Sequence, residues 1–196
     1  MKKTLIVITV IVVVVLVFYS FFKSTYNTMV MNSEQVEAQW AQVENVYQRR
    51  ADLIPNLVNT VKGFAAQEQE VLTGVVEARA KATSVNVNAD NLTEANLQAF
   101  QKAQEGLSGA LSRLMVVVEK YPELKSNQNF LELQSQLEGT ENRITVERMK
   151  FNETTRTYNT YIKSFPQTLL AGMFGFEEKP YFEAAQGADT VPQVEF

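Results

Sequence analysis

Histidine and cysteine are both absent from this chain of 196 residues. Without cysteine, the sequence offers no disulfide, no thiol nucleophile and no thiolate metal ligand. Without histidine, it cannot build a Ser-His-Asp triad, a zinc site with imidazole ligands or the Glu-x-x-His motif of di-iron helical bundles. Most of the usual machinery of enzymes is missing, so we expect no enzymatic activity and no bound metal or cofactor.

The chain also has little excess charge of either sign. Eighteen basic residues spread along the sequence oppose 22 acidic ones, for a net charge of −4. A nucleic-acid-binding surface needs clustered Lys and Arg, so we expect no nucleic-acid partner. The length and the 45% hydrophobic content suffice for one domain with a core, plus appendages.

Two pairs of acids could in principle hold a hard cation through oxygen ligands. Glu34 with Glu37, and Glu138 with Glu141, are three residues apart and would share a helix face. Such pairs are common on solvated helices, and nothing in the sequence brings a third acid to either one. We therefore interpret both pairs as solvated surface.

What the chain does have is a long apolar run near its N-terminus. Thr4 to Phe22 is uncharged and is flanked by Lys2 and Lys3 on one side and by Lys23 on the other. Nineteen helical residues span roughly 28 Å, close to the ~30 Å hydrocarbon thickness of a bilayer. The run ends in aromatic residues, which suit a membrane interface better than a signal-peptidase site. We predict an uncleaved single-pass anchor over residues 1–25, and the lysine count favours the remaining chain on the outer side.

A heptad pattern follows the anchor and predicts a long amphipathic helix. The apolar seam is broken only by Arg50 and Glu68, and we expect this helix to reach Ala82 and to be able to continue from the anchor. Its seam positions are Val36, Trp40, Val43, Tyr47, Arg50, Ile54, Leu57, Val61, Phe64, Glu68, Val71, Val75, Ala78 and Ala82.

Two further helices are predicted. Asn91 and Glu94 resemble a capping box that begins the second helix, which Pro122 ends. The third returns antiparallel to it and stops before Pro166. Its seam repeats every seven residues at Phe130, Leu137, Ile144, Phe151, Tyr158 and Phe165.

We therefore predict an all-α fold, in which the anchor is followed by an elongated antiparallel up-and-down bundle over residues 26–182. The bundle has three long helices, or four if the first one breaks at Pro55. Aromatic residues up to about Phe182 can pack on the bundle end or on the membrane surface, and we favour the bundle. Residues 183–196 are predicted to be disordered.

The segment QRRADLIPNL, residues 48–57, is unusual for the middle of such a helix. The heptad phase does not reset across Pro55, which favours a kinked but continuous helix whose Ala51 carbonyl loses its amide donor. Arg50 occupies a seam position, so its partner is an acid on another helix, a carbonyl freed at the kink, or a second chain. We interpret Trp40, the single tryptophan, as a core or interface anchor. The candidate partner contacts are Arg49, Arg50, Asp52, Pro55, Trp40 and Glu68.

Several stretches resemble the LemA family. They are YN at residues 26–27, WAQVENVYQRRADLIPNLVNTVKGFAAQE at 40–68, EAR at 77–79, YPELKSNQNFLELQSQLEGTENRI at 121–144, ERMKFNETTRTYNTYIKSFP at 147–166 and FGFEEKPYFE at 174–183. The resemblance implies an anchored bacterial membrane protein with an up-and-down bundle, described for the family as four helices. It implies no catalytic residues, and it suggests proximity to membrane proteases or other envelope proteins.

The sequence therefore favours a non-enzymatic scaffold in the bacterial inner membrane. Self-association is expected because the first helix is longer than the other two and its spare apolar face needs cover. The alternative is a regulatory adaptor or sensor that binds a membrane protease or a signalling protein.

Overall fold

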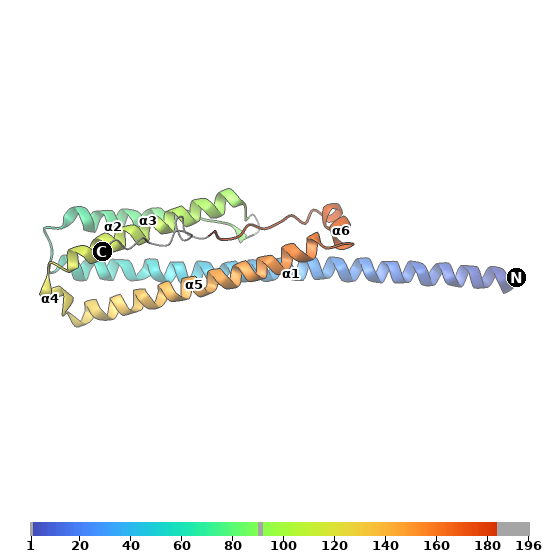
Figure 1. Cartoon of the computed structure of the whole chain (residues 1–196), viewed down its shortest axis with the longest axis horizontal. Coiled ribbons are helices and arrows are strands. Elements are labelled where there is room, and N and C mark those ends of the chain that lie inside the picture. The colour runs from blue at the N-terminus through green and yellow to red at the C-terminus, as the bar shows by residue number, and fades with distance from the viewer. Residues whose placement is uncertain (1, 90–91, 184–196) are drawn as a thin grey trace, which may run out of the picture.

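The predicted all-α fold is confirmed. A computed structural model describes residues 2–89 and 92–183, and every regular element within these ranges is a helix (Figure 1). The helices are α1 (Lys2–Lys62), α2 (Gln69–Ser84), α3 (Glu94–Val118), α4 (Pro122–Lys125), α5 (Gln128–Lys163) and α6 (Gln167–Phe174).

The helices form an elongated bundle with α1 as its full-length member. Figure 1 shows α1 entering from the isolated N-terminal end and running to the far end of the bundle. There α2 reverses direction, α3 runs back to the far end, and α5 returns towards the anchor. The main partner of α1 is α5, and α2 packs mainly on α3. This is the predicted up-and-down arrangement, with four long helices rather than three.

The fourth helix does not arise from a break at Pro55. Helix α1 passes Pro55 without interruption and ends at Lys62, and residues 63–68 form the turn to α2. The expectation that one helix reaches Ala82 is therefore wrong. The heptad spacing continues across this turn because the turn itself packs on the core. The amide of Ala65 donates to the Val61 carbonyl at 2.9 Å, and Ala65 is fully buried.

The helix ends follow local capping chemistry. The hydroxyl of Thr93 accepts a hydrogen bond from the Asn96 amide and caps α3, while the predicted cap Asn91 lies outside the described residues. Asn127 caps α5 in the same way, by accepting from the Phe130 amide at 3.1 Å. Helix α3 ends at Val118, and Pro122 begins the short α4 instead of terminating the helix before it.

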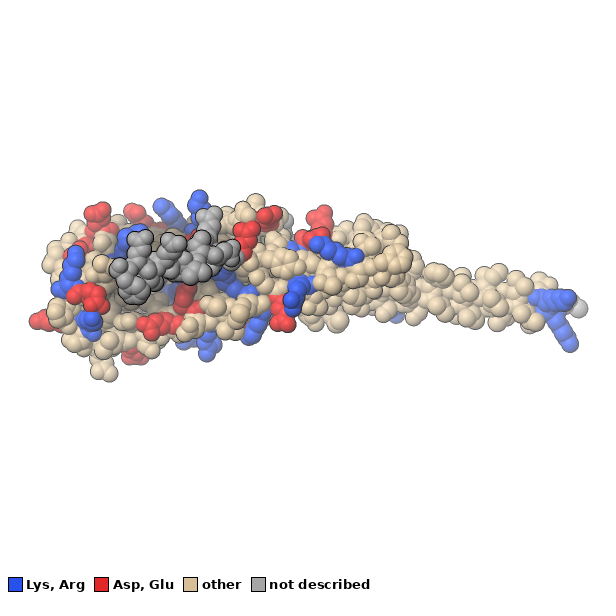
Figure 2. Space-filling view, in the orientation of Figure 1, with Lys and Arg blue, Asp and Glu red and all other residues tan. Residues whose placement is uncertain are grey.

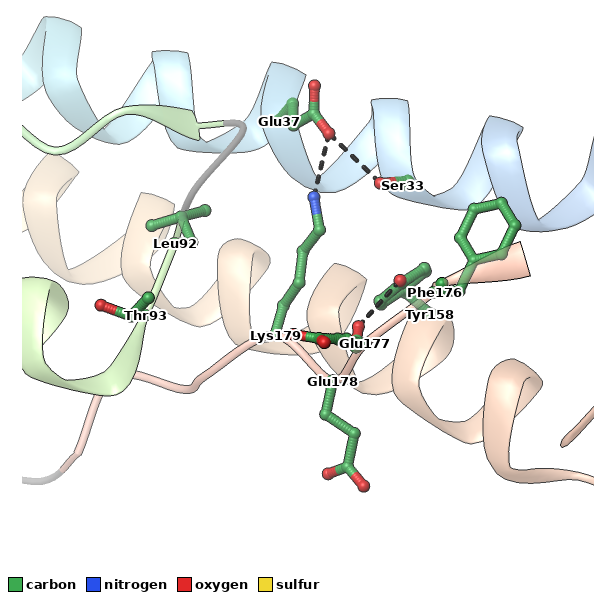
Figure 3. A pocket seen from close by; sticks show the side chains of 10 residues that line it. Ser33, Glu37, Leu92, Thr93, Tyr158, Phe176, Glu177, Glu178 and Lys179 are labelled. Atoms are coloured by element: carbon green, nitrogen blue, oxygen red, sulfur yellow. Dashed lines mark hydrogen bonds and ion pairs between the residues drawn. The ribbon is translucent and has the colours of Figure 1, made fainter. Parts of the chain in front are cut away.

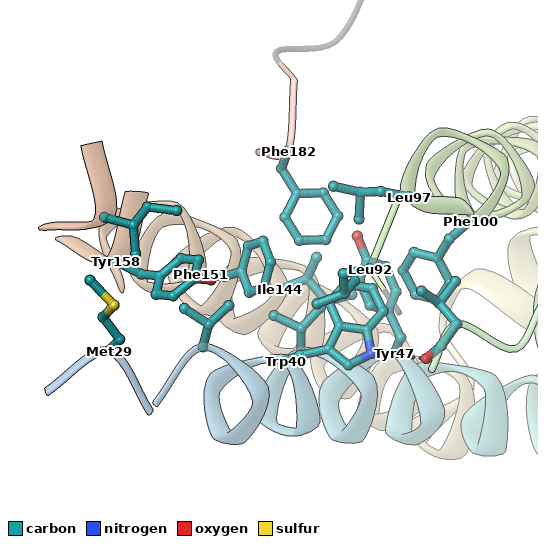
Figure 4. Close-up of a cluster of buried hydrophobic side chains, with 14 of the residues drawn as sticks. Met29, Trp40, Tyr47, Leu92, Leu97, Phe100, Ile144, Phe151, Tyr158 and Phe182 are labelled. Atoms are coloured by element: carbon teal, nitrogen blue, oxygen red, sulfur yellow. Dashed lines mark hydrogen bonds between the residues drawn. The ribbon is translucent and has the colours of Figure 1, made fainter. Parts of the chain in front are cut away.

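The core consists of two apolar clusters along the bundle axis. The cluster nearer the anchor surrounds Trp40, whose ring lies among Phe100, Phe151 and Phe182 (Figure 4). The other cluster fills the far end of the bundle around Ile54. On α5 the seven-residue series supplies both clusters and is buried at Phe130, Leu137, Ile144, Phe151 and Tyr158, whereas its last member, Phe165, lies two residues beyond the end of α5 and is exposed.

After α5 the chain turns at the anchor end of the bundle through α6. It then runs back along the bundle as an extended segment, residues 176–183, which we name the C-terminal strap (Figure 1). Burial of Leu170, Ala171 and Phe182 places this region on the bundle, the alternative that the sequence favoured. Residues 184–196, most of the tail predicted to be disordered, lie outside the described residues.

The N-terminal part of α1 projects beyond the bundle. Its apolar residues have no protein around them, and this is the one helix in the described ranges that is long and apolar enough to cross a membrane. It fits the predicted membrane anchor. The side of the membrane on which the bundle lies stays a prediction.

Candidate functional site

A polar layer separates the two apolar clusters. Tyr47 of α1 belongs to one cluster and Ile54 to the other, and Arg50 lies one helical turn from each of them. Gln104 of α3 and Glu141 of α5 occupy the corresponding positions on their own helices and both bind Arg50. The seam position that broke the heptad pattern therefore marks a layer in which three helices meet through hydrogen bonds.

Arg50 is almost completely buried, with 2% of its surface exposed. One terminal nitrogen, Nη1, donates to Glu141 Oε2 at 2.9 Å and to Ser108 Oγ at 3.1 Å. The other, Nη2, donates to Gln104 Oε1 at 2.7 Å, and the guanidinium lies 5.1 Å from the centre of the Tyr47 ring. The Nε atom of Arg50 has no hydrogen-bond partner among the described residues. Of the three sources of a partner left open by the sequence, an acid on another helix is the one observed.

The carbonyl freed by Pro55 binds a different arginine. Because proline has no amide hydrogen, the Ala51 carbonyl lacks the usual helical donor. Arg79 of α2 supplies one, since its Nε donates to Ala51 O at 2.7 Å. The predicted continuous helix is thus compatible with an internal proline because a neighbouring helix satisfies the exposed carbonyl.

Three of the candidate contacts lie on the outer surface of α1. Arg49, Asp52 and Pro55 are exposed. Asp52 accepts a hydrogen bond from Gln48 at 2.8 Å and lies 4.0 Å from Arg79. Arg49 has no hydrogen bond or ion pair with any residue in the described part of the chain. These residues are available to a partner, and their role as contacts remains a prediction.

The other candidates have internal roles in this structure. Trp40 is fully buried, and its indole donates to the Val87 carbonyl at 3.2 Å. Glu68 is not a seam residue of a continuous helix; it immediately precedes α2 and accepts a hydrogen bond from the Tyr121 hydroxyl at 3.1 Å. Together with Arg50, these two residues hold the bundle together and leave Arg49, Asp52 and Pro55 as its outward members.

The structure adds a set of contacts that the sequence did not reveal. Two asparagines of α5, seven residues apart, each bind the backbone of the C-terminal strap. Asn159 donates to the Lys179 carbonyl at 2.8 Å and accepts from the Lys179 amide at 3.0 Å. Asn152 binds the carbonyl and amide of Phe182 in the same way, at 3.0 and 2.8 Å. Their spacing on one helix face was the available signal.

The strap also encloses a hollow of about 240 Å³ against α1 and α5 (Figure 3). The Lys179 ammonium crosses it to Glu37 Oε1 at 3.0 Å. The Tyr158 hydroxyl donates to the Glu177 carbonyl at 2.9 Å, and burial, together with the nearby carboxylates of Glu37 and Glu177, raises the pKa of Tyr158. These contacts join the strap to the bundle.

Both acid pairs interpreted as solvated surface contribute one member to such contacts. Glu141 binds Arg50 and Glu37 binds Lys179, although 57% of the Glu141 side chain is still exposed. No group of three or more Asp or Glu side chains in the described ranges is arranged to hold a metal ion.

Comparison with known proteins gives consistent matches. The model of the LemA family matches residues 39–196. Magnetosome proteins MamQ 1 and MamQ 2 of Paramagnetospirillum magneticum are each 30% identical over 184 residues, covering 84% of this chain and 67% of the relative. Magnetosome protein MamQ of Magnetospirillum gryphiswaldense is 28% identical, covering 86% and 70%. Protein LemA of Metamycoplasma hominis is 19% identical, covering 87% and 74%.

Proposed function

The chain belongs to the LemA family, and on that premise we propose that it is a membrane-anchored, non-enzymatic scaffold of the bacterial cell envelope that self-associates. The observation that carries the proposal is α1 itself. One unbroken helix runs from the candidate membrane span through the whole bundle, so the bundle is rigidly joined to its anchor. A partner that binds α1 would be held at a fixed distance from the membrane.

One face of α1 remains uncovered along the bundle. Its exposed residues follow one another at spacings of three and four, and they are small or polar rather than strongly charged. They include Ala38, Ala41, Asn45, Gln48, Asp52, Pro55 and Asn59. Small side chains allow a second helix to approach closely, and we name this surface the open face of α1.

Self-association through the open face is supported by the charges on and beside it. Two copies anchored in one membrane have parallel α1 helices, so a symmetric pair brings equivalent residues together. Arg49 and Asp52 are three residues apart, about 4.5 Å along the axis. Arg49 of one copy can therefore reach Asp52 of the other, and the pair forms twice in a symmetric dimer.

This rationale replaces the length mismatch that the sequence suggested. The seam residues beyond Gly63 belong to the turn at 63–68 and to α2, which packs on α1 and α3. They leave no overhanging apolar seam on the first helix. The proposal of self-association now depends on the open face and on Arg49, which has no partner in the described part of the chain.

Photo-crosslinking in the native membrane tests the proposal. A photoreactive residue replaces Gln48, which is exposed on the open face and bonds an acid four residues away on its own helix. Gln98 of α3 is a matched control, because it is exposed and also bonds an acid four residues away. We expect position 48, but not 98, to crosslink copies of this chain.

Other results would reject the scaffold. Capture of one unlike membrane protein, with no crosslink between copies, would favour the adaptor and name its client. If position 48 gave no intermolecular product, the segment at residues 48–57 would serve only the fold of its own chain.

A further inference from the structure

The anchor end of the bundle carries an apolar surface that the scaffold does not explain. Residues 165–176, FPQTLLAGMFGF, contain no charged side chain and include all of α6. On the face of the molecule shown in Figure 2, both signs of charge are scattered over the bundle, whereas the end that adjoins the narrow N-terminal stalk is largely uncharged. A water-facing surface helix ordinarily carries polar residues on its outer side.

Helix α6 is apolar on both its buried side and its exposed side. Leu170 and Ala171 are buried against the bundle. Leu169 and Met173, four residues apart, lie on the other side and are 64% and 69% exposed, and Phe165, two residues before α6 begins, is 81% exposed. The inner side accounts for the attachment of α6 to the bundle. The outer side has no cover within the described structure.

The position of α6 along α1 identifies what covers its outer side. The Phe174 ring lies 5.0 Å from the ring of Tyr26, centre to centre, and Phe176 packs on the same tyrosine. Tyr26 is four residues beyond Phe22, the last residue of the apolar run, or about 6 Å along the helix. The polar interface of a bilayer occupies roughly 5–7 Å on each side of its hydrocarbon core. With the apolar run in the bilayer, this contact puts the C-terminal end of α6 at the level of the lipid headgroups.

We propose that α6 is an interfacial membrane helix, with its Leu169 and Met173, and Phe165 just before it, inserted into the bilayer that the anchor crosses. The lipid surface is continuous with the anchor, and short apolar helices bind at this depth by burying one face among headgroups and upper acyl chains. The glycine at 175 ends α6 in the left-handed conformation, φ 75°, so the chain can leave the membrane directly into the strap.

Insertion of α6 would also restrict the tilt of the scaffold. A single helical anchor can tilt in the bilayer and carries the rigidly joined bundle with it. A second attachment beside the anchor limits that tilt and so holds the open face of α1 at a fixed angle to the membrane surface. The inference rests on the membrane anchor of the proposed function, so its test must report on the anchor separately.

Site-directed spin labelling of the full-length protein in liposomes provides that test. The chain has no cysteine, so each variant carries one label at a chosen place. Met173→Cys and Leu169→Cys probe α6, and Met149→Cys on α5 is a control with the same native residue as position 173 and similar exposure, 61%. Leu16→Cys probes the anchor. Collision with oxygen, which concentrates in lipid, is compared with collision with a water-soluble nickel chelate.

We expect labels at 173 and 169 to have an oxygen-to-nickel collision ratio several-fold above that at 149, approaching that at 16. If the collision ratios at positions 173 and 169 equal the ratio at position 149 while the label at position 16 is in lipid, α6 is not interfacial and the inference is wrong. The membrane anchor would still be supported by that result. If position 16 is also in water, the anchor and the inference fail together. Agreement between 169 and 173 guards against a local disturbance by either label.

Discussion

Replacing Arg50 with methionine should destabilise the bundle, although methionine keeps most of the apolar volume. The substitution removes the donor to Gln104 Oε1 at 2.7 Å, and Gln104 is itself buried. A buried acceptor left without its donor costs about 1–3 kcal/mol. Glu141 adds little to this cost, because its side chain is 57% exposed and water can replace the lost arginine.

The burial of the guanidinium reduces the loss. Arg50 is desolvated and its Nε has no partner among the described residues, so its removal also relieves a cost. We therefore expect Arg50→Met to lower the free energy of unfolding by about 2 kcal/mol. Arg50→Ala should lower it by about 4 kcal/mol, because it adds a cavity between the two apolar clusters.

Urea unfolding of the full-length protein in detergent, followed by circular dichroism, measures both variants. Arg113→Met on α3 is the matched control, since Arg113 is exposed, has no hydrogen bond or ion pair in the described structure and lies away from the open face of α1, and it should change stability by less than about 0.5 kcal/mol. If Arg50→Met were as stable as the wild type, or if Arg113→Met were equally damaging, the hydrogen bonds of the polar layer would not stabilise the bundle.

Three further outcomes are expected. Arg79→Ala should cost about 1 kcal/mol in the wild type and close to nothing in a Pro55→Ala background, where alanine supplies the missing helical amide; additive losses in urea unfolding would contradict this. Hydrogen bonds from Lys150 and from a glutamine of α1 hold the pKa of Glu147 below its ordinary value of 4.5. Its contribution to stability is therefore present above that value and lost as the pH falls through the lowered pKa, so Glu147→Gln should be less stable at neutral pH and converge with the wild type in acid. Asn159→Ala should speed amide hydrogen exchange in the C-terminal strap and leave the far end of α1 unchanged.

Apolar periodicity predicted the helices well and their directions poorly. The unbroken heptad phase favoured a helix that continues through Pro55, and α1 does continue there. The same phase concealed the turn at 63–68, since α2 packs on the same bundle core and needs the same spacing. The apolar period indicates which residues face the core, but it does not indicate the direction in which the next helix runs.

The sequence predicted the candidate site only in part. Arg50 was noticed because a charge at a seam position is rare, which indicated a specific partner but left open whether that partner lay on another helix, at the kink or on a second chain. Asn152 and Asn159 were missed because they bind backbone atoms of the strap, and such contacts leave no pattern in the partner's side chains. The outward role of Arg49, Asp52 and Pro55 depends on a second molecule, which the sequence of one chain does not describe.

Sedimentation equilibrium of the full-length protein in density-matched detergent tests the central claim most directly. The scaffold predicts an oligomer that Arg49→Asp weakens and that Arg49→Asp combined with Asp52→Arg restores, because the exchange rebuilds the pair between copies. A monomer at every concentration would contradict self-association through the open face of α1, as would an oligomer unaffected by either change.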